Sequence, residues 1–279
     1  MPEGQAREFA FTDKDFRHLC QLVDKHTGIQ LAEGKEDMLY GRLARRIRKV
    51  GLNSFKDYIA LLDQGEKSDE FGEFVNAVTT NLTSFFRESH HFDYLKKIVL
   101  PELIKKNSAS RRIRIWSAGS STGEEPYSIA MTVAETMPAG WDVKILATDL
   151  DTDVLAHGER GVYDDSRIGD LDKALVKRWF VKNPSQPGKV RVKPELQELI
   201  HFRKLNLLQE WPMKGPVDII FCRNVIIYFD MPTKQVLMDR YADMLPTGGC
   251  LFLGHSEAMN HMSNRFTLSG KSVYIKAGQ

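Results

Sequence analysis

The spacing of apolar residues divides the chain into two parts. Up to about residue 88, apolar side chains recur at three- and four-residue steps, which is the period of amphipathic helices. Gly28, Gly51 and Gly65 fall where such helices would end. The pattern predicts an all-helical N-terminal domain over residues 1–88, followed by a helical linker over 89–107. Two series show the spacing most clearly: Phe16, Leu19, Cys20 and Val23, and then Leu39, Leu43, Ile47 and Val50.

From residue 108 onward, short apolar runs alternate with helical patterns. Such alternation is typical of a doubly wound α/β fold with a mostly parallel sheet. A turn-rich segment over about 160–208 interrupts the rhythm, and we interpret it as an inserted small antiparallel β-subdomain with a surface loop at 183–192. The expected strands are 112–118, 142–149, 217–224 and 248–255, the expected helices are 124–137, 152–159 and 232–245, and 266–277 is expected to close the sheet as a hairpin.

Composition narrows the class of protein. The 279 residues carry a net charge of +2, which gives no general reason to expect a nucleic-acid partner. The three cysteines are far apart, and His90 and His91 lack the spacing of metal ligands, so no metal site is expected. No 18-residue apolar run is present. We expect a cytoplasmic monomer that is not inserted into the membrane.

The segment Trp116–Met131, WSAGSSTGEEPYSIAM, has the shape of a ligand-binding loop between a strand and a helix. Gly119 and Gly123 allow a tight turn, but the motif GxGxxG and the P-loop sequence GK[ST] are both missing. Glu124 and Glu125 would repel a phosphate by roughly 4 kcal/mol per contact at 4 Å. A cationic ligand without phosphate, such as S-adenosylmethionine, removes this conflict. The alternative is that both carboxylates only favour the start of the helix.

Polar residues at two other predicted strand ends are further site candidates. Asp149 ends the second strand, where an acidic residue binds a ribose diol in related folds. Arg223 and Asn224 end a buried strand, with Tyr228 four residues on. The alternative is that Asn224 only caps a helix and that Tyr228 only packs in the core. The segment 79–88, TTNLTSFFRE, offers a second polar group between two helices, for which the alternative is a capped turn. Its polar candidates are Asn81, Thr83 and Arg87.

Five motifs together resemble the CheR family of chemotaxis receptor methyltransferases. They are NLTSFFRE, GSSTGEEPYSIAM, ATDLD, CRNVIIYFD and GHSEAM. The resemblance runs over nearly the whole chain, in the order of the family. The resemblance implies methyl transfer from S-adenosylmethionine to glutamate side chains of methyl-accepting chemotaxis proteins, with the enzyme recruited to receptor arrays. It implies that Arg87 and Tyr228 face the transferring methyl group. It also implies cofactor contacts for Asn81, Thr83, Arg87, Gly119, Glu124, Asp149, Asn206, Leu207, Arg223 and Asn224.

Two expectations concern receptor binding. Family members often dock a receptor's C-terminal peptide on the β-subdomain. In this chain, segment 183–192 of the subdomain fits either such a docking element or a plain surface loop. The second concerns residues 38–50, which contain five basic and no acidic residues, although residues 1–88 carry 13 basic and 15 acidic ones. Arg42, Arg45, Arg46 and Lys49 share one helix face, with Arg48 off it. A solvated surface and nucleic acid are alternatives, and the resemblance favours docking of the receptor's acidic, methylatable helices.

Two rival classes of function remain beside a methyltransferase. A NAD-dependent oxidoreductase would need the dinucleotide fingerprint GxGxxG, which is missing. A non-catalytic module would keep the cofactor pocket as a sensor. Titration with S-adenosylmethionine and with NAD distinguishes a methyltransferase from an oxidoreductase. A methyl-transfer assay distinguishes a methyltransferase from a sensor.

Overall fold

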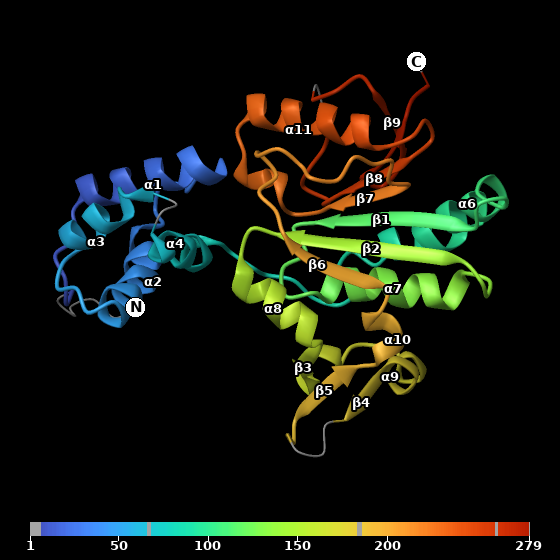
Figure 1. The fold of residues 1–279 in the computed structure, drawn as a ribbon, viewed down its shortest axis with the longest axis horizontal. Coiled ribbons are helices and arrows are strands. Elements are labelled where there is room, and N and C mark those ends of the chain that lie inside the picture. Colours follow the sequence, from blue (N-terminus) through green and yellow to red (C-terminus); the bar gives the residue numbers. More distant parts are fainter. Residues whose placement is uncertain (1–6, 66–67, 183–185, 260–261, 279) are drawn as a thin grey trace. The chain divides into compact units, whose positions relative to one another are not determined.

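The computed structural model describes residues 7–65, 68–182, 186–259 and 262–278, which form two compact units (Figure 1). The helical unit comprises the chain up to Thr80 together with Tyr228–Asp230. The α/β unit comprises Asn81–Ile227 and the chain from Met231 onward. Residues 81–88, which we predicted to belong with the helices, therefore lie in the α/β unit. Within the described residues, no helix is long and apolar enough to span a lipid bilayer.

The helical unit follows the apolar spacing of its sequence. Thr12 and Asp15 form a capping box at the start of α1, and Gly28 ends that helix in a left-handed conformation with φ 69°. The predicted apolar series are buried except for Cys20 and Val50, which are half-buried. The predicted all-helical domain is confirmed. Its helices are α1 (Asp13–Thr27), α2 (Glu36–Lys49), α3 (Phe55–Leu62) and α4 (Asp69–Val78).

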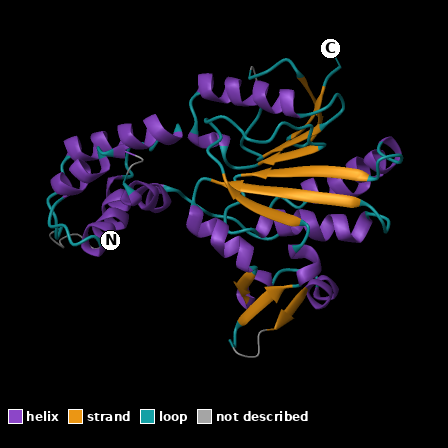
Figure 2. Cartoon of the chain, viewed as in Figure 1, coloured by secondary structure: helices purple, strands orange, loops and turns teal. Residues whose placement is uncertain are grey.

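A seven-stranded sheet forms the centre of the α/β unit (Figure 2). Its order is β6-β2-β1-β7-β8-β10-β9, and the first five strands in that order are parallel. The final pair is the predicted antiparallel hairpin. The strands are β1 (Arg112–Ala118), β2 (Asp142–Asp149), β6 (Ile200–Lys204), β7 (Ile219–Cys222), β8 (Cys250–Leu253), β9 (Phe266–Gly270) and β10 (Val273–Lys276).

Strand β1 shows how both faces of the sheet are covered. Its successive side chains point to opposite faces. Ile113 and Ile115 belong to a core cluster with residues of α7 (Glu124–Thr136). Trp116 instead packs edge-on against Tyr241 of α11 (Met231–Met244) at 5.4 Å between ring centroids. The sheet is therefore doubly wound, as the alternation of elements predicted.

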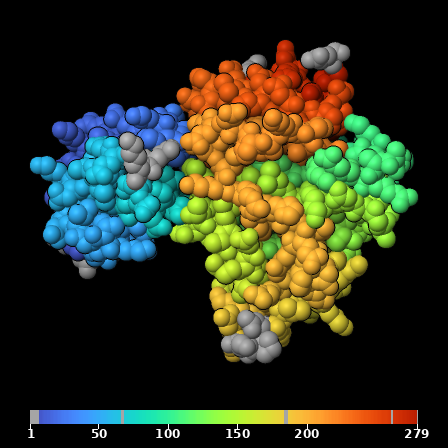
Figure 3. Space-filling model, in the orientation of Figure 1, coloured from blue at the N-terminus to red at the C-terminus, as the bar shows by residue number. Residues whose placement is uncertain are grey.

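The insertion is a separate three-stranded antiparallel sheet in the order β3-β5-β4, and it protrudes from the α/β unit (Figure 3). It is formed by β3 (Val162–Asp164), β4 (Phe180–Lys182) and β5 (Lys189–Val192). Residues 183–185 of the predicted surface loop lie outside the described residues. The predicted end at 208 is wrong, because β6 pairs in parallel with β2 in the main sheet. The buried Phe202 of β6 explains this, since its ring fills the space where a Cβ on Gly158 would lie, at 2.5 Å.

The other elements connect these layers. The predicted linker 89–107 is helical, with a π-helical turn in its middle. The elements are α5 (His90–Tyr94), η2 (Leu95–Val99), α6 (Leu100–Lys106), α8 (Thr152–Arg160), η3 (Asp165–Ile168), α9 (Lys173–Trp179), α10 (Pro194–Gln197) and η4 (Ile226–Tyr228).

Candidate active site

The carboxyl ends of β1, β2 and β7 meet at one edge of the main sheet. The chain leaves β1 to form β2 on one side, and later forms β7 on the other side. This reversal is the topological switch point, where ligands bind in open α/β sheets. The predicted loop at 118–124, Asp149 and Asn224 all follow these strand ends. The structure thus brings together candidates that are up to 106 positions apart in the sequence.

The loop after β1 turns sharply at its glycines. Gly119 has φ 89° and Gly123 has φ 99°, a left-handed region that favours glycine. Close packing also requires Gly119, because a Cβ there would lie 2.3 Å from Cγ2 of Val225. The loop therefore presses directly on the segment that follows β7.

Asp149 is half-buried and oriented by backbone groups. One carboxylate oxygen accepts the N–H of Ser121 at 2.8 Å, and the other accepts that of Asp151 at 3.1 Å. Burial raises the pKa of Asp149 to about 6, against the opposing effect of these hydrogen bonds. A carboxylate has about four acceptor sites, so at least one stays free beside its backbone donors. A ribose diol therefore fits as a donor to this carboxylate.

Three further predicted cofactor contacts lie near the end of β2. The N–H of Leu205 donates to the carbonyl of Asp149 at 2.9 Å, which places Asn206 and Leu207 beside the end of β2. Asn81 donates from its side-chain amide to Asp151 at 2.8 Å. The connecting segment 81–88 and the end of β2 therefore form one polar group.

Arg87 lies between two residues in the left-handed conformation. Phe86 has φ 52° and Glu88 has φ 55°, values that are uncommon for residues other than glycine and that cluster at functional sites. The Phe86 N–H donates to the Ser128 hydroxyl at 2.9 Å, and the Arg87 guanidinium donates to the carbonyl of Leu82 at 2.7 Å. The first bond fixes the backbone next to Arg87, and the second ties its guanidinium to residue 82, while the Arg87 side chain stays partly exposed.

The two carboxylates that suggested a cationic ligand already have cationic partners. Glu124, 1% exposed, forms an ion pair with Arg167 of the insertion and accepts a hydrogen bond from Thr122 at 2.6 Å. Glu125 accepts from Arg223 at 3.0 Å. The argument from uncompensated negative charge is therefore wrong. Glu124 stays a predicted cofactor contact through the resemblance alone.

Arg223 is a buried connector and does not face an open site. Its side chain is 2% exposed, and its guanidinium lies 3.0 Å from Glu125 and 3.4 Å from Glu88. It also donates to the carbonyl of Arg87 and lies over the ring of Phe92. Arg223 therefore fixes the Arg87 segment against β7 and α7, and its predicted contact with the cofactor stays a prediction from the resemblance.

Two carboxylates that we did not predict as site residues support the strand ends. Glu257 accepts the N–H of Asn224 at 2.7 Å, and Glu88 accepts the N–H of His255 at 3.2 Å. Burial alone would raise the pKa of Glu88, but its hydrogen bonds with His255 and the charge of Arg223 outweigh this and lower it to about 2. Both carboxylates fall in the motifs FFRE and GHSEAM, so the motifs carried a signal that the residue types alone did not.

The ligand atoms of Glu88, His90 and His91 lie within 4.8 Å of one another, although their sequence spacing did not suggest a metal site. The guanidinium of Arg223 lies 3.4 Å from the same Glu88 carboxylate. Because this cation already compensates the carboxylate and would repel a second one, we assign no metal to this group.

Tyr228 groups with the helical unit, where its carbonyl accepts the N–H of Gln30 at 2.8 Å. Its predicted role beside the transferring methyl group stays a prediction.

Two side chains of the predicted basic face are used inside the helical unit. Arg46 is 14% exposed, and its guanidinium pairs with Glu70 at 2.6 Å and with Glu73 at 2.5 Å. Arg42 donates to three carbonyls of residues 77–79, at the end of α4. Both arginines therefore hold α2 against α4, and their predicted part in receptor docking stays a prediction.

Three basic side chains of α2 remain exposed: Arg45, Arg48 and Lys49. Arg48 and Lys49 follow Arg45 by three and four positions, so both lie next to it on the helix surface. Arg48 lies 3.3 Å from Glu8, and Lys49 lies 3.8 Å from Glu73. We call this group the basic surface, and it includes Arg48, which the sequence had placed off the face.

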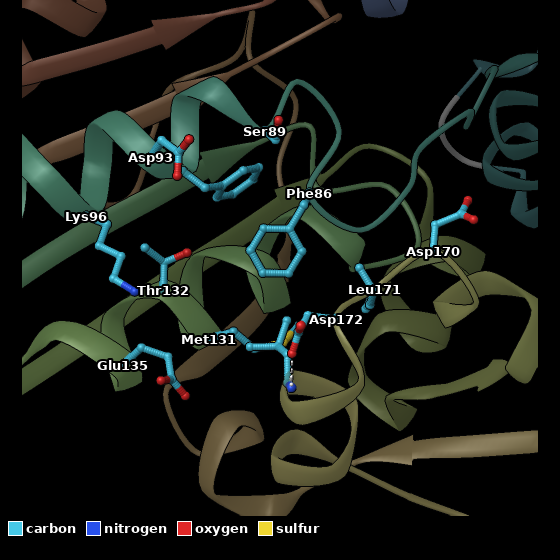
Figure 4. Close-up of a pocket in the computed structure, with 12 residues that line it drawn as sticks. Phe86, Ser89, Asp93, Lys96, Met131, Thr132, Glu135, Asp170, Leu171 and Asp172 are labelled. Atoms are coloured by element: carbon cyan, nitrogen blue, oxygen red, sulfur yellow. Dashed lines mark hydrogen bonds between the residues drawn. The ribbon is translucent and has the colours of Figure 1, made fainter.

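A cavity of about 330 Å³ lies elsewhere in the α/β unit, between α5, η2, α7 and the insertion (Figure 4). Phe86 points its ring into it, beside Met131 and Leu171. None of the predicted cofactor residues lines this cavity. It is therefore distinct from the site at the strand ends.

Comparison with known proteins assigns the family. A family model described as the CheR methyltransferase SAM binding domain matches residues 81–275, and one described as the CheR methyltransferase all-alpha domain matches residues 14–79. The chain is 44% identical to the chemotaxis protein methyltransferase of Escherichia coli, over 95% of this chain and 91% of that one. It is also 44% identical to chemotaxis protein methyltransferase 2 of Pseudomonas aeruginosa, over 97% and 96%.

Among solved structures, a geranyl diphosphate methyltransferase in complex with its substrate and sinefungin matches with a TM-score of 0.35 and 16% identity, over 60% of this chain and 44% of that one. This likeness is too distant to support an argument. The two family models meet at residues 79 and 81, where the described chain also divides into its two units. The chain therefore belongs to the CheR methyltransferase family and is a methyltransferase that uses S-adenosylmethionine.

Proposed function

We propose that this enzyme methylates glutamate side chains of methyl-accepting chemotaxis proteins and so forms the glutamate methyl esters of sensory adaptation. The relatives named above are chemotaxis protein methyltransferases. The observation that carries the proposal is Arg87, a partly exposed guanidinium beside the strand ends, on a backbone fixed by Phe86 and Arg223. A cation in this position suits an acceptor that is itself a carboxylate.

A glutamate acceptor makes small demands on the enzyme. Its ordinary pKa is near 4.3, so it is ionised and nucleophilic at pH 7 without a general base. An amine or alcohol acceptor would first have to lose a proton. Asp149 has both carboxylate oxygens engaged with backbone N–H groups, which suits orientation of a ligand and not proton removal.

The residues at the strand ends supply the groups that would hold the cofactor. S-adenosylmethionine supplies a methyl group on a sulfonium, ready for attack by a carboxylate oxygen. Asp149 would bind the ribose diol, and the Gly119 loop lets the backbone approach closely. We propose the remaining contacts from the resemblance, by Asn81, Thr83, Glu124, Asn206, Leu207, Arg223 and Asn224.

Catalysis then depends on positioning. Holding two reacting groups in line can lower a barrier by roughly 7–11 kcal/mol. Arg87 would orient the acceptor carboxylate or the cofactor's own carboxylate, and it must not bind the reactant so tightly that it is over-stabilised. Tyr228 would donate a hydrogen bond or offer its ring to the sulfonium.

Two surfaces suit the receptor. The basic surface of α2 would meet the acidic, methylatable helices of its cytoplasmic domain. In the insertion, β3 and β4 are edge strands, and an extended C-terminal receptor peptide could add to such an edge. We place the enzyme in the cytoplasm as a monomer recruited to receptor arrays, with no nucleic-acid partner.

The test is transfer of labelled methyl from S-adenosylmethionine to a cytoplasmic receptor fragment. We expect label that alkali releases, since methyl esters hydrolyse in base and methylated amines do not. A fragment with glutamine in place of its methylatable glutamates is the matched control and should stay unlabelled. Binding of S-adenosylmethionine without any transfer would instead support the sensor alternative.

A further inference from the structure

Glu257 is a buried carboxylate that the proposed chemistry does not use. It is 2% exposed, and four backbone N–H groups converge on it. One oxygen accepts from Val225 at 2.8 Å and from Ile227 at 3.2 Å, and the other accepts from Asn224 at 2.7 Å and from Gly254 at 2.6 Å. Within the described part of the chain, no basic side chain pairs with it. The backbone alone therefore compensates this carboxylate.

Three of the four donors belong to the segment 224–227 that follows β7. Asn224 has φ 58°, so the chain leaves the strand direction at once and its N–H groups lose their partners in the sheet. A backbone N–H that is buried without a partner is costly. Glu257 satisfies three such groups together and so defines the shape of this turn.

The same turn packs against the loop after β1. Val225, whose N–H is held by Glu257, occupies the space next to Gly119, where a Cβ would lie 2.3 Å from Cγ2 of Val225. A shift of Val225 toward Gly119 would therefore displace the loop after β1. Asn224 and Gly119 are both predicted cofactor contacts. Glu257 holds the backbone of the turn that contains Asn224 and that packs against Gly119 through Val225.

Gly254 shows how tightly this arrangement is built. A Cβ at this position would lie 2.6 Å from the side-chain nitrogen of Asn224 and 2.8 Å from a carboxylate oxygen of Glu257. Only glycine fits there without moving one of the two. Gly254 thus offers a second way to disturb the turn while the charge of Glu257 is retained.

We propose that Glu257 is a positioning residue of this methyltransferase, whose carboxylate fixes residues 224–227 so that Asn224 and the Gly119 loop bind S-adenosylmethionine. The proposal rests on the cofactor contacts proposed above for Asn224 and Gly119. If the wild-type protein fails to bind S-adenosylmethionine, the proposed cofactor site is wrong. If the wild type binds and the variants below bind equally well, only the role of Glu257 is wrong.

Glu257→Gln is the sharpest change. It keeps the size of the side chain but replaces one acceptor oxygen with an NH₂ donor, which faces two backbone N–H groups in either orientation. Gly254→Ala disturbs the same turn and keeps the carboxylate. Ser256→Ala, at an exposed neighbour, is the matched control.

Calorimetric titration should be made with S-adenosylmethionine and with its product S-adenosylhomocysteine, which lacks the sulfonium charge. We expect Glu257→Gln and Gly254→Ala to weaken both ligands by about tenfold or more, as for the loss of one charge-assisted hydrogen bond, and Ser256→Ala to bind like wild type. A loss confined to S-adenosylmethionine would show that the charge of Glu257 acts on the sulfonium, and would overturn positioning.

Thermal unfolding distinguishes positioning from a merely structural role. A variant that unfolds at a lower temperature but binds both ligands with wild-type affinity when folded would overturn the proposal. If Glu257→Gln does not fold, Gly254→Ala carries the same test, and wild-type affinity in that variant is the contradicting result.

Discussion

Replacing Asp149 with alanine or asparagine tests the cofactor site at the end of β2. Alanine removes the whole carboxylate, which also leaves the N–H groups of Ser121 and Asp151 without an acceptor. Asparagine keeps the shape and one acceptor oxygen but loses the charge. Because the NH₂ group of asparagine faces one of these two N–H groups, both variants disturb the loop, and asparagine leaves one N–H group satisfied.

The structure sets the size of the expected effect. At least one acceptor site of the Asp149 carboxylate stays free for a ribose hydroxyl, and a charge-assisted hydrogen bond contributes roughly 1.5–3 kcal/mol. Since 1.4 kcal/mol is a factor of ten in affinity, Asp149→Ala should weaken S-adenosylmethionine binding by more than about tenfold. We expect Asp149→Asn to bind at an intermediate level.

The raised pKa adds a dependence on pH. Burial brings the pKa of Asp149 to about 6, so its charge is lost as the pH falls through that value. Wild-type affinity for S-adenosylmethionine should therefore be constant well above pH 6 and decline as the pH falls through that value. In Asp149→Asn this decline should disappear, because the amide does not titrate.

The assay is calorimetric titration of each variant with S-adenosylmethionine between pH 5 and pH 8, with circular dichroism to check the fold. Unchanged affinity in a folded Asp149→Ala variant would remove Asp149 from the cofactor site. A decline in affinity that persists in Asp149→Asn would assign the titration to another group.

Three further changes test other parts of the structure. Tyr228→Phe should lower kcat more than cofactor affinity, and an equal fall in both would make Tyr228 a binding residue. Arg45→Glu combined with Lys49→Glu should slow receptor methylation but spare S-adenosylmethionine binding. Initial methylation rates of the wild type should also fall as salt rises, since charges beyond roughly 8–10 Å are screened. A double variant that methylates receptor as fast as wild type at low salt would refute docking. Glu88→Gln should lower the free energy of unfolding at pH 7 by roughly 2–3 kcal/mol. The reason is that a carboxyl with a pKa of about 2 stabilises the fold above its ordinary pKa of 4.5, and this contribution is lost as the pH falls through 2. Equal stability of variant and wild type in urea titrations at pH 7 would contradict this prediction.

The elements that depend on local pattern could be predicted from the sequence. The strands 112–118 and 142–149 have the predicted bounds, because apolar runs between turn residues define them locally. The strand 200–204 was instead assigned to the insertion. The sequence of this strand does not show that it pairs with β2. Parallel strands are joined by long crossovers, so the partner lies far away along the chain.

The same limit applies to charged residues. Helical periodicity placed Arg42 and Arg46 on one face, but it could not show that α4 supplies Glu70 and the carbonyls that they bind. Glu124 and Glu125 seemed uncompensated because their partners, Arg167 and Arg223, lie 43 and 98 positions away. Predicting which charges are free therefore requires the tertiary structure.

The proposed reaction makes one product that can be located directly. After incubation with S-adenosylmethionine, a cytoplasmic receptor fragment can be digested and its peptides sequenced by tandem mass spectrometry, with an Asp149→Ala enzyme as the control. We expect the added methyl group on glutamate side chains, and its loss after mild alkali. A methyl group found instead on lysine, cysteine or the N-terminal amine, stable in alkali, would contradict glutamate methylation by this enzyme.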